Sequence, residues 1–378
     1  MAGYWLAGEV TAWRAMQRTS RDPGDLLERL DAWLARQLPG RHATAVDVRV
    51  PDSNGMSNET ILLDAAWLDD GGTPVEHRLV VRMAPDPGDV PVFPTYDLVS
   101  QHRAMRLVAA RSTVPVPTAR WLELDLGVLG APFLVMDRID GRVPPDVMPY
   151  TFEGWLRDAT PAEQRTLQDA CVAAIAGLHA IELYYDDLSW LTAANSSRSH
   201  DSPLRAHVEH WRDYYDWVRD GVAIPIIDAG FAWIESNWPA GDGGEPVFCW
   251  GDARIGNMMF DGFTPVAVLD WEMVGWGPRG LDLGWAVFLH TFFDDIANEF
   301  DLPGIPHMFG ADDVRATYRE VAGVDPGDLH WYETWAALRH GIVMARIHQR
   351  RLHFGEVAPV SDPDEAVMHR ARLAQMIE

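Results

Sequence analysis

A set of carboxylate and amide side chains is concentrated in residues 248–278. Asp252 follows a Trp-Gly pair, Asn257 comes shortly after it, and Asp270 ends the apolar run of residues 266–269. Carboxylate and amide oxygens are ligands of Mg²⁺, and a positioned carboxylate accepts the proton of an attacking hydroxyl. These residue types favour phosphoryl transfer, with Asp252 as the proton acceptor and Asn257 and Asp270 as ligands of Mg²⁺ on a nucleoside triphosphate.

Two short strands are expected to bring Asn257 and Asp270 together. Residues 258–260 and 266–269 are apolar, and the Asp-Gly pair between them is a typical turn sequence. A hairpin places the residue before its first strand beside the residue after its second strand. The two expected metal ligands should therefore be neighbours in space.

The D-x-x-x-x-N spacing from Asp252, followed by an Asp at a strand end, is the catalytic-loop and metal-ligand pattern of the kinase fold. Trp250-Gly251 stands where protein kinases have a His, and Trp271-Glu272 stands where they have Phe-Gly. These departures, and the lack of an Ala-Pro-Glu element, point away from a protein substrate. On its own the spacing also occurs by chance, and an Asp at a strand end is often a turn former.

The larger pattern WGDxRxGN followed by LDWE resembles the aminoglycoside phosphotransferase and choline-kinase-like superfamily, whose members phosphorylate small-molecule hydroxyls. Within it the chain is most similar to the actinobacterial phosphotransferase-family branch, which is related to the kinase domains fused to some acyl-CoA dehydrogenases. The resemblance extends over about residues 48–354. It implies an α+β, protein-kinase-like two-lobed fold, with a β-rich N-lobe and a mostly helical C-lobe, and ATP or GTP with Mg²⁺ as cofactors.

Three segments are expected from this resemblance and from the residue pattern. Residues 1–45 are predicted to be an N-terminal helical lead-in, because apolar residues at helical spacing stop at Pro39-Gly40. Residues 46–140 carry strand and turn patterns and are expected to form the N-lobe, with the nucleotide-binding sheet and helix. Residues 141–378 are expected to form the C-lobe, with the catalytic loop, the metal site and a substrate cleft.

A loop between two predicted strands is the expected cover of the nucleotide phosphates. In the resembled family this loop, here Gly55, Met56, Ser57 and Asn58, offers backbone N–H groups to the phosphates. A single Gly in a polar loop is also typical of an ordinary turn. Arg82 falls where kinases place a strand lysine, and since the chain has no lysine, only an Arg can supply that cation. The alternative is a surface Arg that closes a strand.

Residues 130–141 are predicted to be an apolar strand that leads into a polar hinge. The resemblance implies that Met136 lies at the back of the base pocket, and that the Asp137 carbonyl and the Ile139 N–H bond the nucleobase edge. In the resembled fold a helix Glu pairs with the strand lysine. The nearest candidate here is Gln101, so either a hydrogen bond would replace that ion pair or the ion pair lies elsewhere.

Two side chains near the catalytic stretch have competing interpretations. Arg254 could neutralise the γ-phosphate or orient the catalytic carboxylate, and an ion pair with Glu272 or Asp282 is an equal alternative. His179 ends a predicted helix, where a hydrogen-bonded structural histidine is a better interpretation than a catalytic one.

The acceptor is expected to be a small molecule with a hydroxyl group, and the motif leaves its identity open among an aminoglycoside, a hydroxyacyl-CoA and an amino alcohol. A cationic antibiotic would need a carboxylate cluster, and Asp294, Asp295, Glu299 and Asp301 offer one. A CoA ester would need Arg groups for its phosphates. The alternative function is a nucleotide-binding kinase-like protein, regulatory or scaffold, without transferase activity.

The composition excludes several partners. The chain has 31 Lys and Arg against 56 Asp and Glu, a formal net charge of −25, which repels nucleic acid and anionic membrane. Diffuse acidity also serves solubility, so the charge does not select a substrate. Cys171 and Cys249 lie far apart with no metal or redox spacing. With no leader pattern and no long apolar run, we expect a soluble, cytoplasmic protein, and the sequence leaves its oligomeric state open.

Overall fold

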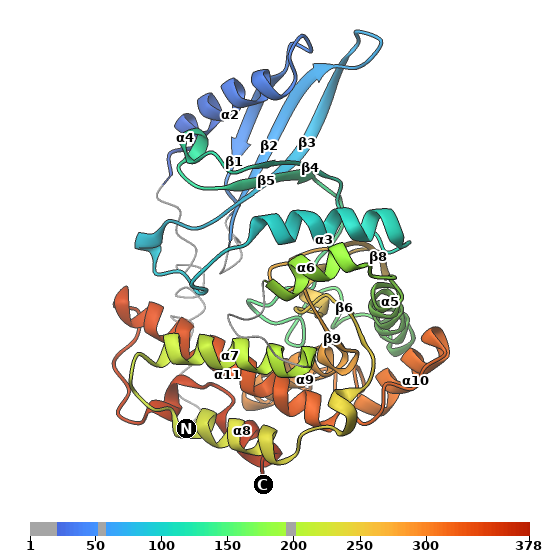
Figure 1. Ribbon diagram of the computed structural model, residues 1–378, viewed down its shortest axis with the longest axis vertical. Coiled ribbons are helices and arrows are strands. Elements are labelled where there is room, and N and C mark those ends of the chain that lie inside the picture. Colours follow the sequence, from blue (N-terminus) through green and yellow to red (C-terminus); the bar gives the residue numbers. More distant parts are fainter. Residues whose placement is uncertain (1–20, 52–57, 194–201) are drawn as a thin grey trace. The chain divides into compact units, whose positions relative to one another are not determined.

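The computed structural model describes residues 21–51, 58–193 and 202–378 of the chain (Figure 1). Among these residues, 21–106 and 117–140 form one compact unit, called here the sheet unit, and 107–116 and 141–378 form the helical unit. Helix α2 (Pro23–Gln37), which falls inside the predicted lead-in, thus belongs to the sheet unit. The segment limits expected from the sequence at residues 45 and 140 stay a prediction.

The sheet unit contains a five-stranded antiparallel sheet in the order β1-β2-β3-β5-β4. Its strands are β1 (Thr44–Arg49), β2 (Glu59–Leu68), β3 (Pro74–Met83), β4 (Ala119–Glu123) and β5 (Phe133–Asp137). Its helical segments besides α2 are η1 (Pro87–Asp89), α4 (Leu126–Leu129) and the first part of α3 (Leu98–Arg111). Strand β2 alternates buried and half-buried residues, as expected when one face of a strand covers a core.

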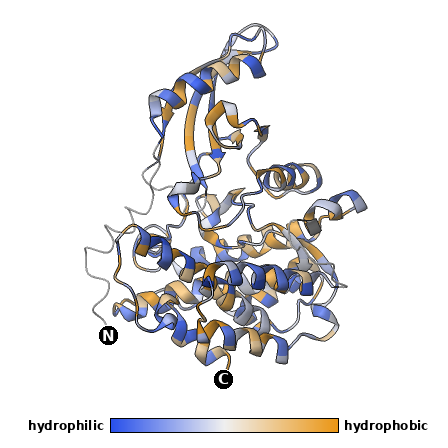
Figure 2. Ribbon diagram, turned by 60° about the vertical axis from the view of Figure 1, so that its left-hand side comes forward, coloured by the Kyte–Doolittle hydropathy of each residue, from blue (hydrophilic) through white to orange (hydrophobic). Residues whose placement is uncertain are grey.

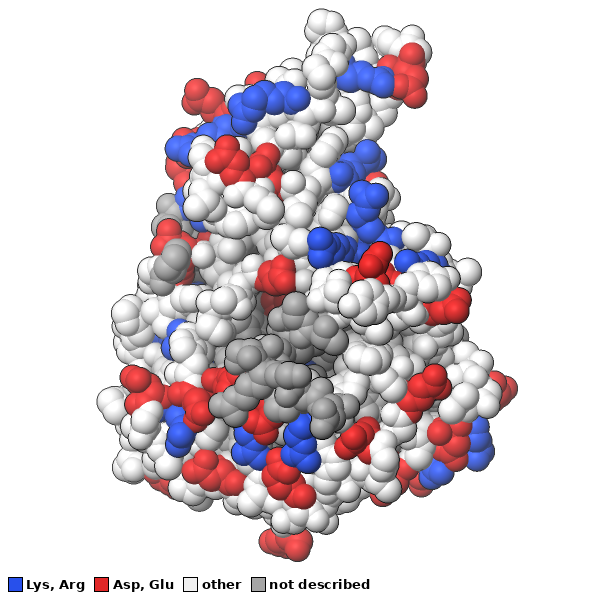
Figure 3. Space-filling model, in the orientation of Figure 1, with Lys and Arg blue, Asp and Glu red and all other residues white. Residues whose placement is uncertain are grey.

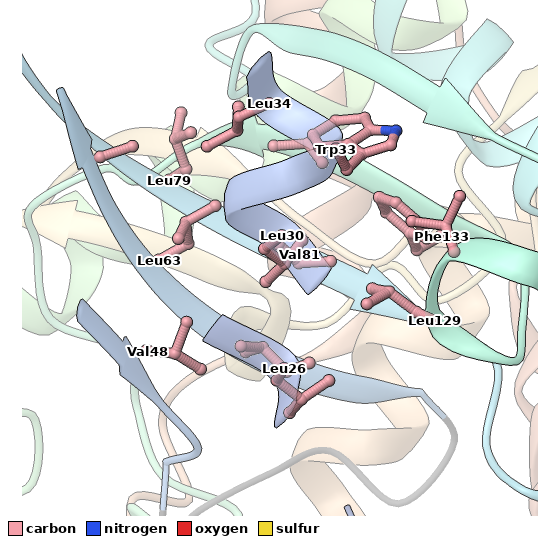
Figure 4. Packing of buried hydrophobic residues seen from close by; sticks show 14 of the residues in the cluster. Leu26, Leu30, Trp33, Leu34, Val48, Leu63, Leu79, Val81, Leu129 and Phe133 are labelled. Carbon is pink, nitrogen blue, oxygen red and sulfur yellow. The ribbon is translucent and has the colours of Figure 1, made fainter. Parts of the chain in front are cut away.

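Helix α2 packs on this sheet through an apolar face (Figure 4). The Asp22 side chain caps its first turn and Pro23 begins it, which fixes where the helix starts. The buried residues of α2 recur at helical spacing and are Leu26, Leu30, Trp33 and Leu34. The Trp33 ring meets the Phe133 ring of β5 edge to face, with centroids 5.1 Å apart. Fully burying one such Leu stabilises the fold by about 1.5–3 kcal/mol.

The helical unit holds most of the helices and two small two-stranded sheets. The helices are α5 (Pro161–His179), α6 (Tyr185–Ala193), α7 (Pro203–Arg219), α8 (Pro225–Ser236), α9 (Gly280–Glu299), α10 (Ala311–Ala322), α11 (His330–His353) and α12 (Arg370–Met376), with the short turns η2 (Ala240–Gly243), η3 (Ile255–Asn257) and η4 (Pro363–Ala366). The two sheets pair β6 (Pro246–Cys249) with β9 (Gly275–Pro278) and β7 (Met258–Asp261) with β8 (Thr264–Val268). Both are antiparallel, and the expected β7–β8 hairpin is confirmed.

Helices α9 and α11 pack closely because two glycines leave room for an aromatic ring. A Cβ at Gly280 would lie 2.2 Å from the ring of Tyr332, and one at Gly284 would lie 2.6 Å from the Tyr332 backbone. Any side chain with a Cβ atom at these two positions would clash with Tyr332 and force the helices apart. Helix α9 is buried around most of its circumference, which places it at the centre of the unit.

The outer helices are amphipathic. Helix α7 buries one face, made by Leu204, Val208, Trp211, Tyr214, Tyr215 and Val218. Figure 2 shows blue and orange residues along the same helices, and Figure 3 shows acidic and basic side chains interspersed on the visible surface. Across the described ranges, no helix combines the length and the apolarity needed to cross a membrane.

Candidate active site

The loop that follows β6 carries Asp252, and its backbone is hydrogen-bonded to Asp282 of α9. The Asp282 carboxylate accepts the backbone N–H groups of Trp250 and Gly251, each at 2.8 Å. Gly251 has φ +91°, and a Cβ there would lie 1.9 Å from the Met273 carbonyl oxygen, so only glycine fits this turn. The strand end and the start of α9 therefore fix the backbone just before Asp252.

His179 contacts the same Asp282 carboxylate that holds the catalytic loop. Its Nε2 lies 3.1 Å from Asp282 Oδ2, and its Nδ1 lies 2.9 Å from the hydroxyl of Tyr318. The expectation that this helix-end histidine is hydrogen-bonded within the protein is confirmed. Cys249 lies beside it, and together with His179 and Asp282 it forms a buried cluster with ligand atoms within 4.8 Å of one another. Burial raises the pKa of the Cys249 thiol, and its sulfur contacts the Gly277 carbonyl at 3.4 Å.

Asp252 is 7% exposed, and three side chains donate to its carboxylate. Trp285 Nε1 donates to Oδ1 at 2.7 Å, and Asn257 Nδ2 donates to Oδ2 at 2.6 Å. Arg254 Nε lies 3.1 and 3.2 Å from the two oxygens. The structure thus brings Asp252, Arg254 and Asn257 into direct contact, and it adds Trp285, which the sequence did not single out.

Arg254 is held between two carboxylates. Besides Asp252, it forms an ion pair with Asp146, through NH1 and Oδ2. Burial opposes the charged guanidinium, but Asp146, Asp252 and Asp270 outweigh burial and raise the pKa of Arg254 above its ordinary value. Of the partners considered from the sequence, Asp282 is instead bound to the backbone of the catalytic loop.

The β7–β8 hairpin brings Asn257 and Asp270 to adjoining positions. The Leu269 N–H donates to the Asn257 carbonyl at 2.8 Å, and Met258 pairs with Val268 in the ladder. The Trp250 indole donates to the carbonyls of Leu269 and Asp270, at 2.9 and 3.1 Å. Asp270 adopts φ +57°, a left-handed conformation that costs energy for a residue other than glycine.

The chemistry of these two side chains fits Mg²⁺. An amide oxygen and a carboxylate are both hard oxygen donors. The Nδ2 atom of Asn257 is committed to Asp252, which fixes the direction of the amide oxygen on the same carbon. Asn257 and Asp270 can therefore hold the ion expected from the sequence.

The residues expected to contact the nucleotide lie in the sheet unit, where they are described by themselves. Asn58 is buried just before β2, and Arg82 lies in β3, between its ladder partners Thr60 and Leu134. Gly55, Met56 and Ser57 fall outside the described residues.

Three further expected nucleotide contacts lie at the end of β5. Met136 is buried in this strand, and Asp137 ends it with its carboxylate paired to Arg120. Ile139 follows the strand and is half-buried. The nucleotide roles of these residues stay predictions, as does that of Arg82. Gln101 is buried in α3, and its Nε2 has no hydrogen-bond partner in the part of the chain that the structure describes.

The carboxylate cluster considered for a cationic acceptor is partly engaged within the protein. Asp294 accepts the backbone N–H of Ile305 at 2.6 Å, and Asp295 forms a two-pronged ion pair with Arg372. A cavity with room for about one water molecule lies beside Arg254, and its lining is mostly apolar and aromatic: Tyr150, Ala286, Leu289, Phe293 and Phe309, with His290. Burial lowers the pKa of His290, which favours its uncharged form.

Comparison with known proteins adds three findings. The family model described as the phosphotransferase enzyme family matches residues 48–323. Among curated proteins, acyl-CoA dehydrogenase family member 11 of Gallus gallus is 29% identical over 262 residues, which is 68% of this chain and 30% of that protein. Family member 10 of Mus musculus is 22% identical over 93% of this chain and 31% of that protein. The chain thus spans about 30% of the length of these relatives.

Solved structures share the fold. A candidate aminoglycoside phosphotransferase from Ralstonia eutropha has a TM-score of 0.62 at 22% identity, covering 93% of this chain and 96% of that one. An ethanolamine kinase of Plasmodium vivax has a TM-score of 0.58 at 11% identity, covering 100% and 95%. Together with the antiparallel sheet unit and the helical unit, these likenesses confirm the predicted α+β, kinase-like fold.

Proposed function

Because the chain belongs to the phosphotransferase enzyme family, we propose that it transfers the γ-phosphoryl group of ATP or GTP to a hydroxyl group of a small molecule. The main support is Asp252, a buried carboxylate that is held by three side chains and is followed by Asn257 and Asp270. Phosphoryl transfer depends mostly on positioning and on neutralising charge, and this arrangement of fixed polar groups suits both tasks.

In this proposal Asp252 accepts the proton of the acceptor hydroxyl as its oxygen attacks the γ-phosphorus. An ionised carboxylate offers about four lone-pair sites. Three N–H groups, from Trp285, Asn257 and Arg254, approach it, and the Arg254 Nε–H is shared between the two oxygens at 3.1 and 3.2 Å. The side chain is thus fixed in orientation, and the long, shared Arg254 contact is the one that an acceptor hydroxyl would displace most readily.

Asn257 and Asp270 would hold Mg²⁺ through an amide oxygen and a carboxylate. When bound, the ion neutralises charge on the transferred phosphoryl group. Asn257 then has two tasks, because its Nδ2 holds Asp252 while its Oδ1 binds the metal. The Trp250 indole, which donates to the Asp270 carbonyl, keeps the second ligand beside the first.

We assign Arg254 to the orientation of Asp252. Its guanidinium forms ion pairs with two carboxylates, those of Asp252 and Asp146. It remains charged because its pKa is raised. A guanidinium committed to two carboxylates is less available to a phosphate than a free one would be.

The nucleotide contacts are assigned to the sheet unit. Asn58, with Gly55, Met56 and Ser57 before it, would offer backbone N–H groups to the phosphates. Arg82 would supply the cation that a lysine supplies in kinases.

The hinge after β5 would bind the nucleobase. Met136 would lie behind the base, and the Asp137 carbonyl and the Ile139 N–H would bond its edge. Asp137 is suited to this because its carboxylate is occupied by Arg120, which leaves recognition to the backbone.

For the acceptor, we favour an alcohol that carries few positive charges over a polycation. Asp294 and Asp295, which a polycation would use, are bound to Ile305 and Arg372. Carboxylates that are already engaged within the protein are less available to a cationic acceptor.

The test is a screen of alcohols, amino alcohols, hydroxyacyl-CoA esters and aminoglycosides for Mg²⁺-dependent ADP release, with GTP run in parallel. The blank is Asp252→Asn, and the matched control is Asp261→Asn, an exposed carboxylate at the end of β7. Acceptor-dependent release by the wild-type protein and by Asp261→Asn, but not by Asp252→Asn, supports the proposal. Equal release by all three proteins would refute it.

The competing function is nucleotide binding without phosphoryl transfer, and two residues of the expected nucleotide site motivate it. Arg82 falls where kinases have a lysine, and Gln101 is the nearest candidate for the position of the usual Glu. Mg²⁺-dependent ATP binding with no ADP release on any acceptor would establish that function.

A further inference from the structure

Trp285 lies against the carboxylate of Asp252. Its indole Nε1 donates to Asp252 Oδ1 at 2.7 Å, and the two residues are 3% and 7% exposed. We propose that Trp285 is a positioning residue, which sets the orientation of the Asp252 carboxylate for proton transfer. This inference rests on the proposed function of Asp252 as the base.

Helix α9 holds the catalytic loop through two residues on one face. Asp282 and Trp285 are three positions apart, so their side chains point in the same direction from the helix. Asp282 accepts the backbone N–H groups of Trp250 and Gly251, whereas Trp285 donates to the side chain of the next residue, Asp252. One helix thus fixes both the backbone of the loop and the direction of its carboxylate.

The indole N–H of Trp285 restricts the rotation of the Asp252 carboxylate about its χ2 bond. Trp285 and Asn257 each hold one oxygen, at 2.7 and 2.6 Å, while Arg254 Nε reaches both at 3.1 and 3.2 Å. Guanidinium groups favour two parallel bonds to a carboxylate. Without the indole N–H, Asp252 would be free to turn into such a paired geometry with Arg254, which would occupy the lone pair needed for the acceptor proton.

The ring of Trp285 is itself held from helix α11. The Arg339 guanidinium carbon lies 4.4 Å from the Trp285 ring centroid and 4.7 Å from that of Trp211. Arg339 also donates to the Gly251 carbonyl at 3.2 Å. Burial lowers the pKa of Arg339 to about 10, against the opposing effect of nearby carboxylates, so it stays charged near neutral pH. Arg339 therefore ties the indole to the loop whose carboxylate that indole contacts.

Trp331 provides a matched control. It is another buried indole of the helical unit, and its Nε1 donates to a backbone carbonyl, that of Ile234, at 3.2 Å. Phe in either position keeps most of the ring and removes the N–H donor. Both variants should lose some stability, but only Trp285→Phe removes a bond to Asp252.

The kinetic test compares wild type, Trp285→Phe, Trp331→Phe and Asp252→Asn in ADP release with ATP and the acceptor found in the screen. We expect Trp285→Phe to lower kcat by about 10- to 100-fold, because a hydrogen bond to a charged group is lost, with the KM for ATP changed less than about twofold. Trp331→Phe should keep its kcat. Equal kcat values for the two Phe variants would overturn the role of Trp285. Full activity of Asp252→Asn would overturn the proposed function instead.

A second measurement does not depend on turnover or on the folding of Trp285→Phe. In uniformly ²H,¹³C,¹⁵N-labelled protein, the Trp285 indole N–H resonance, linked to its assigned backbone through side-chain correlations, should move upfield in Asp252→Asn, because a charged acceptor becomes neutral. The Trp331 resonance should stay in place. A Trp285 resonance that does not move would show that the bond to Asp252 is not made in solution, and would overturn the proposal.

Discussion

Two regions of the molecule are held in place by different kinds of interaction. One is the packing of α2 on the sheet, and the other is the support of the catalytic loop by α9 and α11. The first is apolar, with Leu26, Leu30 and Trp33 packed against the strands. The second is polar, with Asp282 and Arg339 buried beneath the loop and hydrogen-bonded to it. Apolar packing stabilises without specifying each atom's direction, whereas a buried hydrogen bond specifies direction and is costly when one partner is lost. The comparison predicts that the two regions respond differently to small changes.

The largest effect is expected at Asn257, where one side chain serves two proposed tasks. Asn257→Ala removes the donor that holds Asp252 Oδ2 and also one proposed metal ligand. We expect kcat to fall by about 10²–10⁴-fold, as for a mispositioned base, and the Mg²⁺ concentration at half-maximal rate to rise. The measurement is a Mg²⁺ titration of acceptor-dependent ADP release. An unchanged Mg²⁺ requirement would remove Asn257 from the metal site.

Removal of the Asp282 carboxylate, which accepts two N–H groups of the catalytic loop, should lower both the stability of the fold and the activity. Asp282→Ala leaves the N–H groups of Trp250 and Gly251 buried without acceptors, which we expect to cost about 2–5 kcal/mol in the free energy of unfolding. Asp282→Asn retains one acceptor oxygen and should lose less. Denaturant unfolding followed by far-UV circular dichroism gives both values. Equal losses for Ala and Asn would show that the acceptor oxygen contributes nothing.

Where α2 packs on the sheet, the free energy of unfolding should depend more on the size of a side chain than on its shape. Leu30 is fully buried, so Leu30→Ala should lower the free energy of unfolding by about 2–5 kcal/mol, while Leu30→Met should lower it by less than about 1.5 kcal/mol. Under conditions where each variant is folded, kcat should equal that of the wild type. A fall in kcat with Leu30→Met would mean that this core also specifies the geometry of the site.

The smallest expected effect is a pH dependence in the helical unit. Burial, reinforced by Asp328 and Asp312, raises the pKa of Glu333 from 4.5 to about 7. Because the folded state holds this proton more tightly than the unfolded state, the stabilisation is complete below pH 4.5 and is lost as the pH rises through 7. Glu333→Gln should flatten this decline in the midpoint of thermal unfolding, whereas the exposed Glu320→Gln should not. Parallel pH curves for the wild type and Glu333→Gln would contradict the assignment.

Local features of the fold were predictable from the sequence. The capping box at Thr160 and Glu163 begins α5 where both hydrogen bonds form, and the Asp-Gly turn produces the β7–β8 hairpin. Asp252, Asn257 and Asp270 could be singled out because they share one continuous stretch of chain. In each case the deciding interactions lie within a few residues of one another, and the residue types encode them.

The contacts that complete the site join residues far apart in the sequence. Asp146 meets Arg254, Trp285 meets Asp252, and Arg339 meets the Gly251 carbonyl. No periodicity marks such pairs, because they depend on how α9 and α11 pack. The one available signal was the i, i+3 spacing of Asp282 and Trp285, which places both on a single helix face.

The central claim is that Asp252 accepts the proton of a hydroxyl that attacks a nucleotide γ-phosphate. Its most direct test is ³¹P NMR of the phosphorylated acceptor, formed under single-turnover conditions by wild type, Asp252→Asn and Asp261→Asn. We predict that the phosphoester signal appears about 10²–10⁴-fold more slowly with Asp252→Asn and at the wild-type rate with Asp261→Asn. Formation of the phosphoester at the wild-type rate by Asp252→Asn would contradict the account.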